Sequence, residues 1–102
     1  MTNHTDKELL MMAAKASGLS LLHPDKDGDE YLLSYGKAWN PLTDDGDALR
    51  LAVKLSLYIF IDDKKVHVDG PDLTVLERFK DCPYAATRRA ITRAAAAIGE
   101  KL

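Results

Sequence analysis

Three closely spaced aspartates, Asp44, Asp45 and Asp47, are the densest group of side chains in this sequence that could bind an ion. They precede an apolar periodic segment, so they stand where a helix should begin and where its dipole favours negative charge. Carboxylates also bind divalent metals, with Asp62 and Asp63 as more distant helpers, but no histidine is near in sequence. Capping of the helix accounts for the first three without an ion. We therefore expect no metal and no cofactor.

Two neighbouring arginines near the C-terminus, Arg88 and Arg89, are the natural counter-ions of this acidic group. Arg88 flanks the apolar stripe of a predicted helix. A guanidinium fork can hold a carboxylate of the same chain or a phosphate from outside. We expect an internal ion pair with Asp44, Asp45 or Asp47, and an anion of a ligand or partner is the alternative.

Trp39, followed by Asn40 and Pro41, is either a core residue over the end of a sheet or an exposed anchor for a partner. Tryptophan is common in both places. An exposed Trp39 could stack on a base while Arg88 and Arg89 hold phosphate, so a nucleotide or other small molecule is the alternative ligand. The candidate binding residues are Trp39, Asn40, Asp44, Asp45, Asp47, Tyr84, Arg88 and Arg89.

No set of residues in the sequence predicts a reaction. Cys82 stands beside a helix N-terminus, where a thiolate is stabilised, but nothing marks the base that a nucleophile needs. His4, His23 and His67 are scattered, and one cysteine adds too little for a zinc site. The acidic run 25–30 matches a calcium loop only in part, since its glycine is fourth rather than sixth. We name no catalytic residue, and this favours a non-enzymatic protein.

Composition limits the class of partner. Of 102 residues, 14 are Lys or Arg and 16 are Asp or Glu, so the net charge is −2. General binding to nucleic acid or to a membrane surface needs a basic excess, so both are disfavoured. A single cysteine excludes an internal disulfide, and no apolar run reaches the roughly 18 residues that span a bilayer. We expect one cytoplasmic domain over residues 1–102, large enough for a core of its own.

The first half of the chain carries clear helix and hairpin signals. Thr5 and Glu8 have the spacing of a capping box, which predicts a helix over 6–17. Two apolar segments flank a turn rich in aspartate and glycine. We expect these segments, 19–22 and 31–35, to pair as a hairpin.

A second helix is predicted after Pro41, with Thr43 as its N-cap. Its apolar residues cover an arc of about 200°, which predicts deep burial. These residues are Ala48, Leu49, Leu51, Ala52, Val53 and Leu55. Replacement of Leu49 by alanine should then cost about 2–5 kcal/mol.

The run LYIFI at 57–61 has no polar alternation, which predicts a strand covered on both faces. The segment 66–69 alternates like a half-exposed strand, and its free edge leaves dimerisation by strand pairing open. We expect the segment 73–79 to form an additional edge strand. A last helix begins at 81–83. Its expected inner stripe is Tyr84, Thr87, Ile91, Ala94, Ala95, Ile98 and Leu102.

The order of these elements predicts an α+β fold. An antiparallel sheet of four or five strands should carry helices on both faces, because the strand at 57–61 needs cover on both. We therefore expect a three-layer α/β/α sandwich with three helices.

Two stretches, WNPLTDDGDALRLAVKL and DCPYAATRRAITRAAAAIGEKL, resemble the phage ABA sandwich domain proteins, small proteins of tailed phages and prophages. The resemblance covers nearly the whole chain and implies the α/β/α fold and a phage origin. It implies no activity and no catalytic residue. Together with the small size, it suggests an accessory protein in the host cytoplasm, monomeric or homodimeric, that binds a host protein such as a defence component.

Overall fold

The computed structural model describes residues 4–19, 22–24, 30–34 and 37–102. Three helices and six strands lie in these ranges. In chain order they are α1 (Asp6–Ser17), β1 (Leu22–Pro24), β2 (Glu30–Ser34), β3 (Lys37–Trp39), α2 (Asp45–Lys54), β4 (Tyr58–Ile61), β5 (Lys65–Gly70), β6 (Leu73–Arg78) and α3 (Pro83–Glu100). The fold is α+β, as predicted.

Helix α1 has the predicted bounds and the predicted capping box. The amide of Glu8 donates to Thr5 Oγ1 at 3.1 Å, and the amide of Thr5 donates to Glu8 Oε1 at 3.0 Å. The hydrogen bonds with Thr5 hold the pKa of the Glu8 carboxyl below its usual value. Gly18 ends the helix at φ 86°, a left-handed conformation in which glycine carries no steric penalty.

Strands β1, β2 and β3 form a small antiparallel sheet in that order. The predicted hairpin exists, but its strands are displaced along the chain, with Leu22 opposite Leu32. Strand β3 was not predicted, and it pairs with β2. The predicted turn and the calcium-like run largely coincide with residues 25–29, which lie outside the described residues.

Strands β4, β5 and β6 form a second antiparallel sheet, with β5 in the centre. The additional strand predicted at 73–79 is confirmed as β6. The alternation predicted for 66–69 is confirmed, because Val66 and Val68 of β5 are fully buried whereas His67 and Asp69 are not. The predicted free edge is wrong, because β5 pairs with β4 on one side and with β6 on the other. Apolar and polar residues alternate along β5 because one face of the sheet packs on the helices and the other faces outward. A central strand can show this pattern just as an edge strand can.

The prediction of a doubly covered strand at 57–61 is wrong. Strand β4 is an edge strand, and Tyr58, Phe60 and Ile61 are 68%, 56% and 58% exposed. The prediction assumed that the apolar run forms a central strand, with neighbouring strands on both sides. Here β3 joins β2 in a separate sheet instead of extending the β4 edge.

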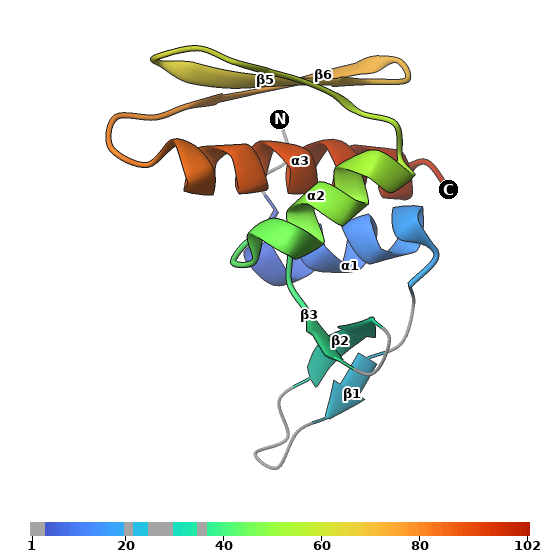
Figure 1. Ribbon diagram of the computed structural model, residues 1–102. Helices are drawn as coiled ribbons and strands as arrows, with labels where there is room; N and C mark the ends of the chain where they lie inside the picture. Colours follow the sequence, from blue (N-terminus) through green and yellow to red (C-terminus); the bar gives the residue numbers. More distant parts are fainter. Residues whose placement is uncertain (1–3, 20–21, 25–29, 35–36) are drawn as a thin grey trace.

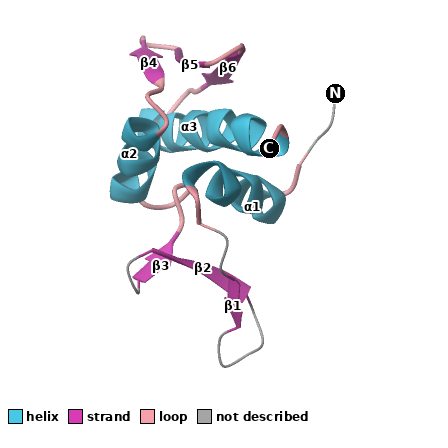
Figure 2. Cartoon of the chain, turned by 90° about the vertical axis from the view of Figure 1, so that its right-hand side faces the viewer, coloured by secondary structure: helices cyan, strands magenta, loops and turns pink. Residues whose placement is uncertain are grey.

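The helices lie between the two sheets (Figures 1 and 2). Helix α3 packs against β5 and β6 on one side and against α1 on the other. The helices approach so closely that a Cβ at Gly99 would stand 1.8 Å from the carbonyl oxygen of Met12. The described residues therefore do not form the expected single sheet of four or five strands with helices on both faces. Direct packing of α1 on α3 puts both helices on the same side of β4–β6.

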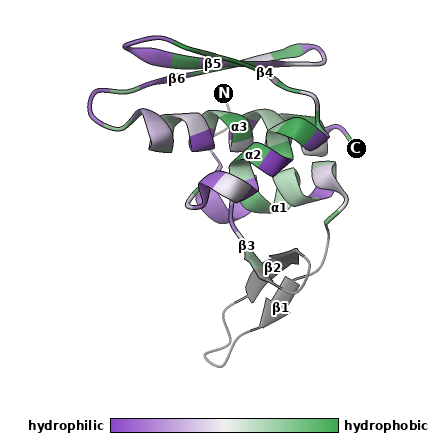
Figure 3. Ribbon diagram, in the orientation of Figure 1, coloured by the Kyte–Doolittle hydropathy of each residue, from purple (hydrophilic) through white to green (hydrophobic). Residues whose placement is uncertain are grey.

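Helix α2 lies beside α3 and under β4 (Figure 2). Its N-cap is Asp44, not Thr43, because the carboxylate of Asp44 accepts the amide proton of Asp47 at 2.8 Å. Ala48, Leu51 and Ala52 are buried, whereas Leu49 and Val53 are exposed, so the predicted 200° of burial is too wide. Hydrophobic residues therefore lie on the exposed side of α2 as well as in the core. Figure 3 shows the hydropathy of the residues along this helix.

Helix α3 begins at Pro83, and the Sγ atom of Cys82 accepts the amide proton of Ala85 at 3.4 Å. The middle of its predicted inner stripe is correct, since Ile91, Ala94 and Ala95 are buried. The ends are not, because Tyr84 and Leu102 are exposed and Leu102 lies beyond the end of α3.

Candidate functional site

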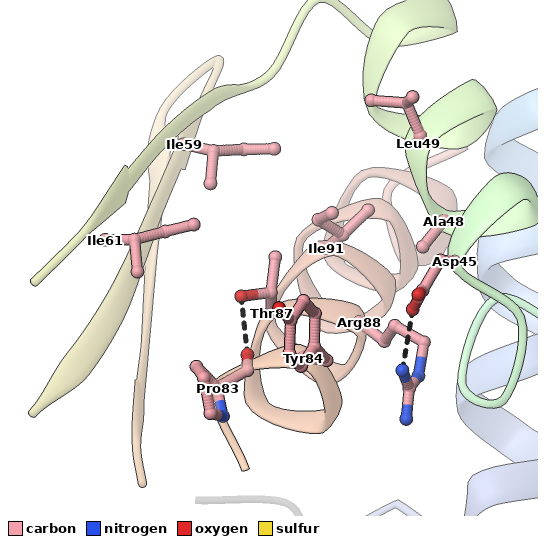
Figure 4. Close-up of a pocket in the computed structure, with 10 residues that line it drawn as sticks. All are labelled: Asp45, Ala48, Leu49, Ile59, Ile61, Pro83, Tyr84, Thr87, Arg88 and Ile91. Atoms are coloured by element: carbon pink, nitrogen blue, oxygen red, sulfur yellow. Dashed lines mark hydrogen bonds and ion pairs between the residues drawn. The ribbon is translucent and has the colours of Figure 1, made fainter. Parts of the chain in front are cut away.

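An apolar groove of about 510 Å³ opens between β4, α2 and α3. Its apolar wall consists of Ala48, Leu49, Ile59, Ile61, Tyr84 and Ile91. In Figure 4, Ile59 and Ile61 point from β4 toward α3, and Leu49 points toward them from α2. Only Asp45, Thr87 and Arg88 bring charged groups or an aliphatic hydroxyl to the lining, so the groove is suited to an apolar occupant.

Local structure explains why these side chains face one space. Ile59 stands opposite Val68 and Ile61 opposite Val66, so both isoleucines lie on the inner face of the sheet. Leu49 and Val53 are four residues apart and share one side of α2. Pro83 at the first position of α3 places Tyr84 in the first turn, at the mouth of the groove.

The polar end of the groove is an ion pair between Arg88 of α3 and Asp45 of α2. Arg88 Nη1 lies 2.6 Å from Asp45 Oδ1, and Arg88 Nε donates to the carbonyl oxygen of Leu42 at 2.9 Å. The predicted internal ion pair is confirmed for Arg88. Nε and Nη1 of the guanidinium are thus both engaged within the protein, and the contact with Asp45 joins the two helices.

The other two aspartates stabilise the turn before α2. Asp47 is buried and accepts the amide proton of Asn40 at 2.9 Å and a proton of the Arg50 guanidinium at 2.7 Å. Asn40 in turn accepts the amide proton of Leu42 at 2.9 Å. Among the described residues no group of three His, Cys, Asp or Glu is arranged to hold a metal.

The predicted binding residues are not one site. Tyr84, Arg88 and Asp45 line the groove. Trp39 is 7% exposed and belongs to the core. Arg89 turns to α1, where its Nη1 lies 3.0 Å from Asp6. A buried tryptophan leaves no exposed ring in this position to stack on a base.

Sequence reasoning missed Leu49, Ile59 and Ile61 as functional candidates because it placed them in the core. One signal could have found them. The apolar run of β4 ends directly at the charged turn Asp62–Lys65, and only four residues of it form strand. A short apolar strand between a helix and a charged hairpin turn can equally be an edge.

The outward-facing side of the second sheet carries a second group of exposed side chains, which we name the outer face: Tyr58, Phe60, His67, Asp69, Thr74 and Leu76. The rings of Phe60 and His67 are 6.3 Å apart, and Thr74 Oγ1 donates to Asp69 at 3.0 Å. None of the described elements lies over this face (Figures 1 and 2).

The remaining reactive side chains are dispersed. Cys82 is exposed and acts as a helix cap. His4 lies between α1 and α3, with its ring nitrogens 3.8 Å from Glu8 and 3.7 Å from Glu100. His67 belongs to the outer face. Thr87, the hydroxyl in the groove, donates to the carbonyl oxygen of Pro83 at 2.7 Å. The groove thus offers surfaces for binding, with no nucleophile–base pair among its lining residues.

Comparison of the chain with protein-family models, with curated proteins and with solved structures finds no match. The resemblance to the phage ABA sandwich domain proteins therefore stays a prediction. None of the helices in the described part of the chain is both long and apolar enough to cross a membrane.

Proposed function

We propose that this chain acts by binding another protein rather than by catalysing a reaction, and that its outer face is the recognition surface. The observation that supports this most directly is a sheet face with Tyr58, Phe60 and Leu76 exposed and no described element above it. Single exposed apolar residues are ordinary on proteins, whereas a contiguous group of them marks an interaction site.

The composition of the outer face suits a protein partner. Tyrosine and phenylalanine supply large contact areas, and they are enriched in interface centres. Polar groups surround them: Asp69 and Thr74 bond to each other, and Lys65 and Arg78 stand opposite one another at the end of the sheet. An apolar centre with a polar rim is the usual anatomy of a specific interface.

The partner we propose is a host protein, with the chain acting as a phage-encoded accessory protein in the host cytoplasm, for example as an inhibitor of a defence component. The resemblance to phage ABA sandwich domain proteins and the small size support this. In such a complex the partner would supply the third layer that the sequence predicts over the sheet, so that the α/β/α sandwich is completed between two chains.

A lysate-capture experiment with matched variants tests this proposal. Leu76 on the outer face and Met11 on α1 are exposed to nearly the same extent, 40% and 39%. Because both side chains are exposed, we expect glutamate at either position to leave the fold intact, and Leu76→Glu and Met11→Glu then differ in the face that they change. We expect the wild type and Met11→Glu to capture the same bacterial protein and Leu76→Glu to capture at least about tenfold less.

Mass spectrometry of the captured material, followed by calorimetric titration of the purified partner, gives the measurement. Recovery of no specific protein by the wild type contradicts the proposal. Equal capture by both variants also contradicts it, because the outer face would then be irrelevant to binding.

A second candidate function is binding of a small apolar molecule in the groove, whose 510 Å³ lies within the roughly 300–1,000 Å³ of ordinary ligand sites. A nucleotide is less well matched, because Arg88 is already paired with Asp45. A ligand that binds only the folded chain must raise its melting temperature. A thermal-shift screen of apolar metabolites and nucleotides therefore tests this candidate, and no shift with any compound counts against it.

A further inference from the structure

The free edge of β4 has a defined pattern of unpaired backbone groups. The amide of Asp62 donates to the carbonyl oxygen of Lys65 at 3.0 Å, which closes the β4–β5 hairpin. Residues in an antiparallel ladder alternate between hydrogen-bonded and non-hydrogen-bonded pairs. Phe60 and Tyr58 therefore bond to β5, and the backbone N–H and C=O groups of Ile59 and Ile61 point outward from the sheet.

This edge lacks the usual protection. Natural edge strands carry proline, inward-pointing charges, a bulge or a covering segment, because an open edge otherwise pairs with another strand. Strand β4 consists of Tyr58, Ile59, Phe60 and Ile61, and it pairs with β5 in continuous register without a bulge. Among the described residues no other segment pairs with its outer side.

We propose that a second copy of this chain pairs with β4 across a two-fold axis and joins the two three-stranded sheets into one continuous sheet. In the antiparallel register centred on Phe60, Ile59 lies opposite Ile61 of the second copy, and the two Phe60 rings meet on the outer face. The pairing satisfies the outward N–H and C=O groups of both isoleucines. An isologous contact of this kind closes on itself as a dimer.

The apolar area around β4 is of the size that a stable dimer needs. Exposed apolar residues gather along the edge and on the side of the groove beneath it: Leu49, Val53, Tyr58, Phe60, Ile61 and Tyr84. At roughly 100–150 Å² of exposed surface each, they amount to about 700 Å² per copy, close to the about 800 Å² per partner of a standard interface.

The same pairing buries no charge without a partner. Residues 58–61 carry no charged side chain, and the first carboxylates, Asp62 and Asp63, fall beyond the end of the strand. In the proposed register Asp62 lies opposite Tyr58 of the second copy rather than opposite another acid. Unpaired buried charge is the main obstacle to close association, and here it does not arise. The groove beneath β4 then receives Ile59, Ile61 and the α2 side chains of the second copy.

The dimer goes beyond the proposed function, because β4 and the groove serve the second copy while the part of each outer face away from β4, around His67, Thr74 and Leu76, remains available for a host protein. The two outer faces become one broad surface with two-fold symmetry. A symmetric or repeated partner would then bind more tightly than each single face alone allows.

Sedimentation velocity and light scattering of the purified chain over about 1–200 μM test the inference, with Ile61→Pro as the principal variant. Ile61 has its N–H directed outward, so proline there removes a donor to the second copy and leaves the β4–β5 ladder intact. Arg78→Pro is the matched control: Arg78 ends β6 as Ile61 ends β4, and its N–H also points away from β5. We expect a dimer for the wild type and for Arg78→Pro, and a dissociation constant at least about tenfold higher for Ile61→Pro.

A second variant, Ile61→Lys, keeps the backbone donor and places a charge at the seam, so it separates loss of association from loss of fold. Circular dichroism and thermal melting should show both variants folded. A wild type that stays monomeric over the whole range overturns the inference, as does a dimer that Ile61→Lys and Ile61→Pro leave unchanged.

The sedimentation and lysate-capture experiments can fail independently of each other. A monomeric wild type whose capture of a bacterial protein is lost in Ile61→Lys would assign the β4 edge to a foreign partner, which overturns the dimer and leaves the binding function. A dimer that captures no bacterial protein would support this inference and contradict the proposed function.

Discussion

Helix α3 makes different contacts with the two edges of the second sheet. On the β6 side, Arg93 of α3 donates to the carbonyl oxygen of Leu76 at 3.1 Å and pairs with Glu77, so a side chain of the same chain covers part of this edge. On the β4 side, Arg88 of α3 turns away to Asp45 and to the carbonyl oxygen of Leu42. Among the described residues, no side chain of α3 therefore forms a hydrogen bond with the β4 edge.

The comparison shows that whether an edge strand stays uncovered depends on its side chains as well as on its position in the sheet. Strand β6 alternates, with Val75 buried and Arg78 exposed, and its inner acid Glu77 faces an arginine. Strand β4 offers apolar side chains to both faces and no charge to pair. A closed edge of this kind stabilises the monomer, whereas an open apolar edge gains stability only when another chain covers it.

The largest expected effect separates the two sides of α2. Leu51 lies in the core, and Leu49 lies in the groove under the β4 edge and is 61% exposed. We expect Leu51→Ala to lower the free energy of unfolding by about 2–4 kcal/mol and Leu49→Ala by less than about 1 kcal/mol.

Urea denaturation in the Ile61→Lys background measures these values without a contribution from association. A cost for Leu49→Ala as large as that for Leu51→Ala would mean that the β4 side of α2 is covered in the monomer, and the comparison of the two edges would fail.

The next effect concerns the arginine on the β4 side. Arg88→Lys loses the Nε bond to Leu42 and the short contact with Asp45, because lysine cannot present two donors in a fork. We expect a loss of about 1–2 kcal/mol in the free energy of unfolding. Arg89→Lys is the control, since Arg89 makes one contact with Asp6 and is more exposed, and it should cost less than about 0.5 kcal/mol.

Equal losses for the two substitutions, measured by urea denaturation, would show that Arg88 does not join α2 to α3 as the geometry indicates. The pairing of Arg88 with Asp45 and Leu42 would then not explain why the β4 edge is uncovered.

A smaller effect concerns the arginine on the β6 side. Arg93→Met removes the donor to Leu76 and leaves Glu77 unpaired, but Arg93 remains partly in contact with water. We expect a loss of about 0.5–1.5 kcal/mol by urea denaturation. Glu77→Gln, which keeps the shape and removes the charge, should cost less. An Arg93→Met variant as stable as the wild type would show that β6 is not held closed by this contact.

The smallest expected effect on stability concerns Asp62, in the turn between β4 and β5. Asp62 accepts the amide protons of Lys64 and Lys65 at 2.8 and 2.9 Å, and these bonds, that of Lys64 first, lower the pKa of its carboxyl. A lowered pKa means that the charged form stabilises the fold above the ordinary aspartate value and that this stabilisation disappears as the pH falls through the lowered pKa.

Asp62→Asn should therefore melt slightly below the wild type at pH 7, and the difference should narrow as the pH approaches 3. Thermal melting across this range measures the effect. Asp63→Asn, at a neighbouring carboxylate that accepts no amide proton in the described structure, should show no narrowing. A constant difference for Asp62→Asn would show that the charge at the turn does not stabilise the hairpin.

Local signals in the sequence predicted the helices well. The capping box of Thr5 and Glu8 and the proline at position 83 fixed the starts of α1 and α3, because a cap acts within a few residues. The cap of α2 was placed one residue early, at Thr43 instead of Asp44, since several acceptors compete there. Strand β3 escaped prediction because only its pairing with β2 defines it.

The candidate site was predictable in part. Arg88 and the acidic helix start of α2 were recognisable because opposite charges on neighbouring helices pair over short distances, and Asp45 proved to be the partner. The groove was not predictable. Its walls come from β4, α2 and α3, and apart from the charged turn that follows Ile61 no local feature distinguishes Leu49 and Ile61 from residues that are buried.

The sequence by itself determined where α1 and α3 begin, that Thr5 and Glu8 cap α1, and that Arg88 would find an acidic partner. These properties depend on interactions within one or two turns of chain or on charge. Only the tertiary structure decided that two sheets form instead of one, that β5 is central, and that β4 is left open beside a groove. Hydrophobic periodicity tells which side chains avoid water, but whether the same chain or a second one covers them depends on how the elements pack in space.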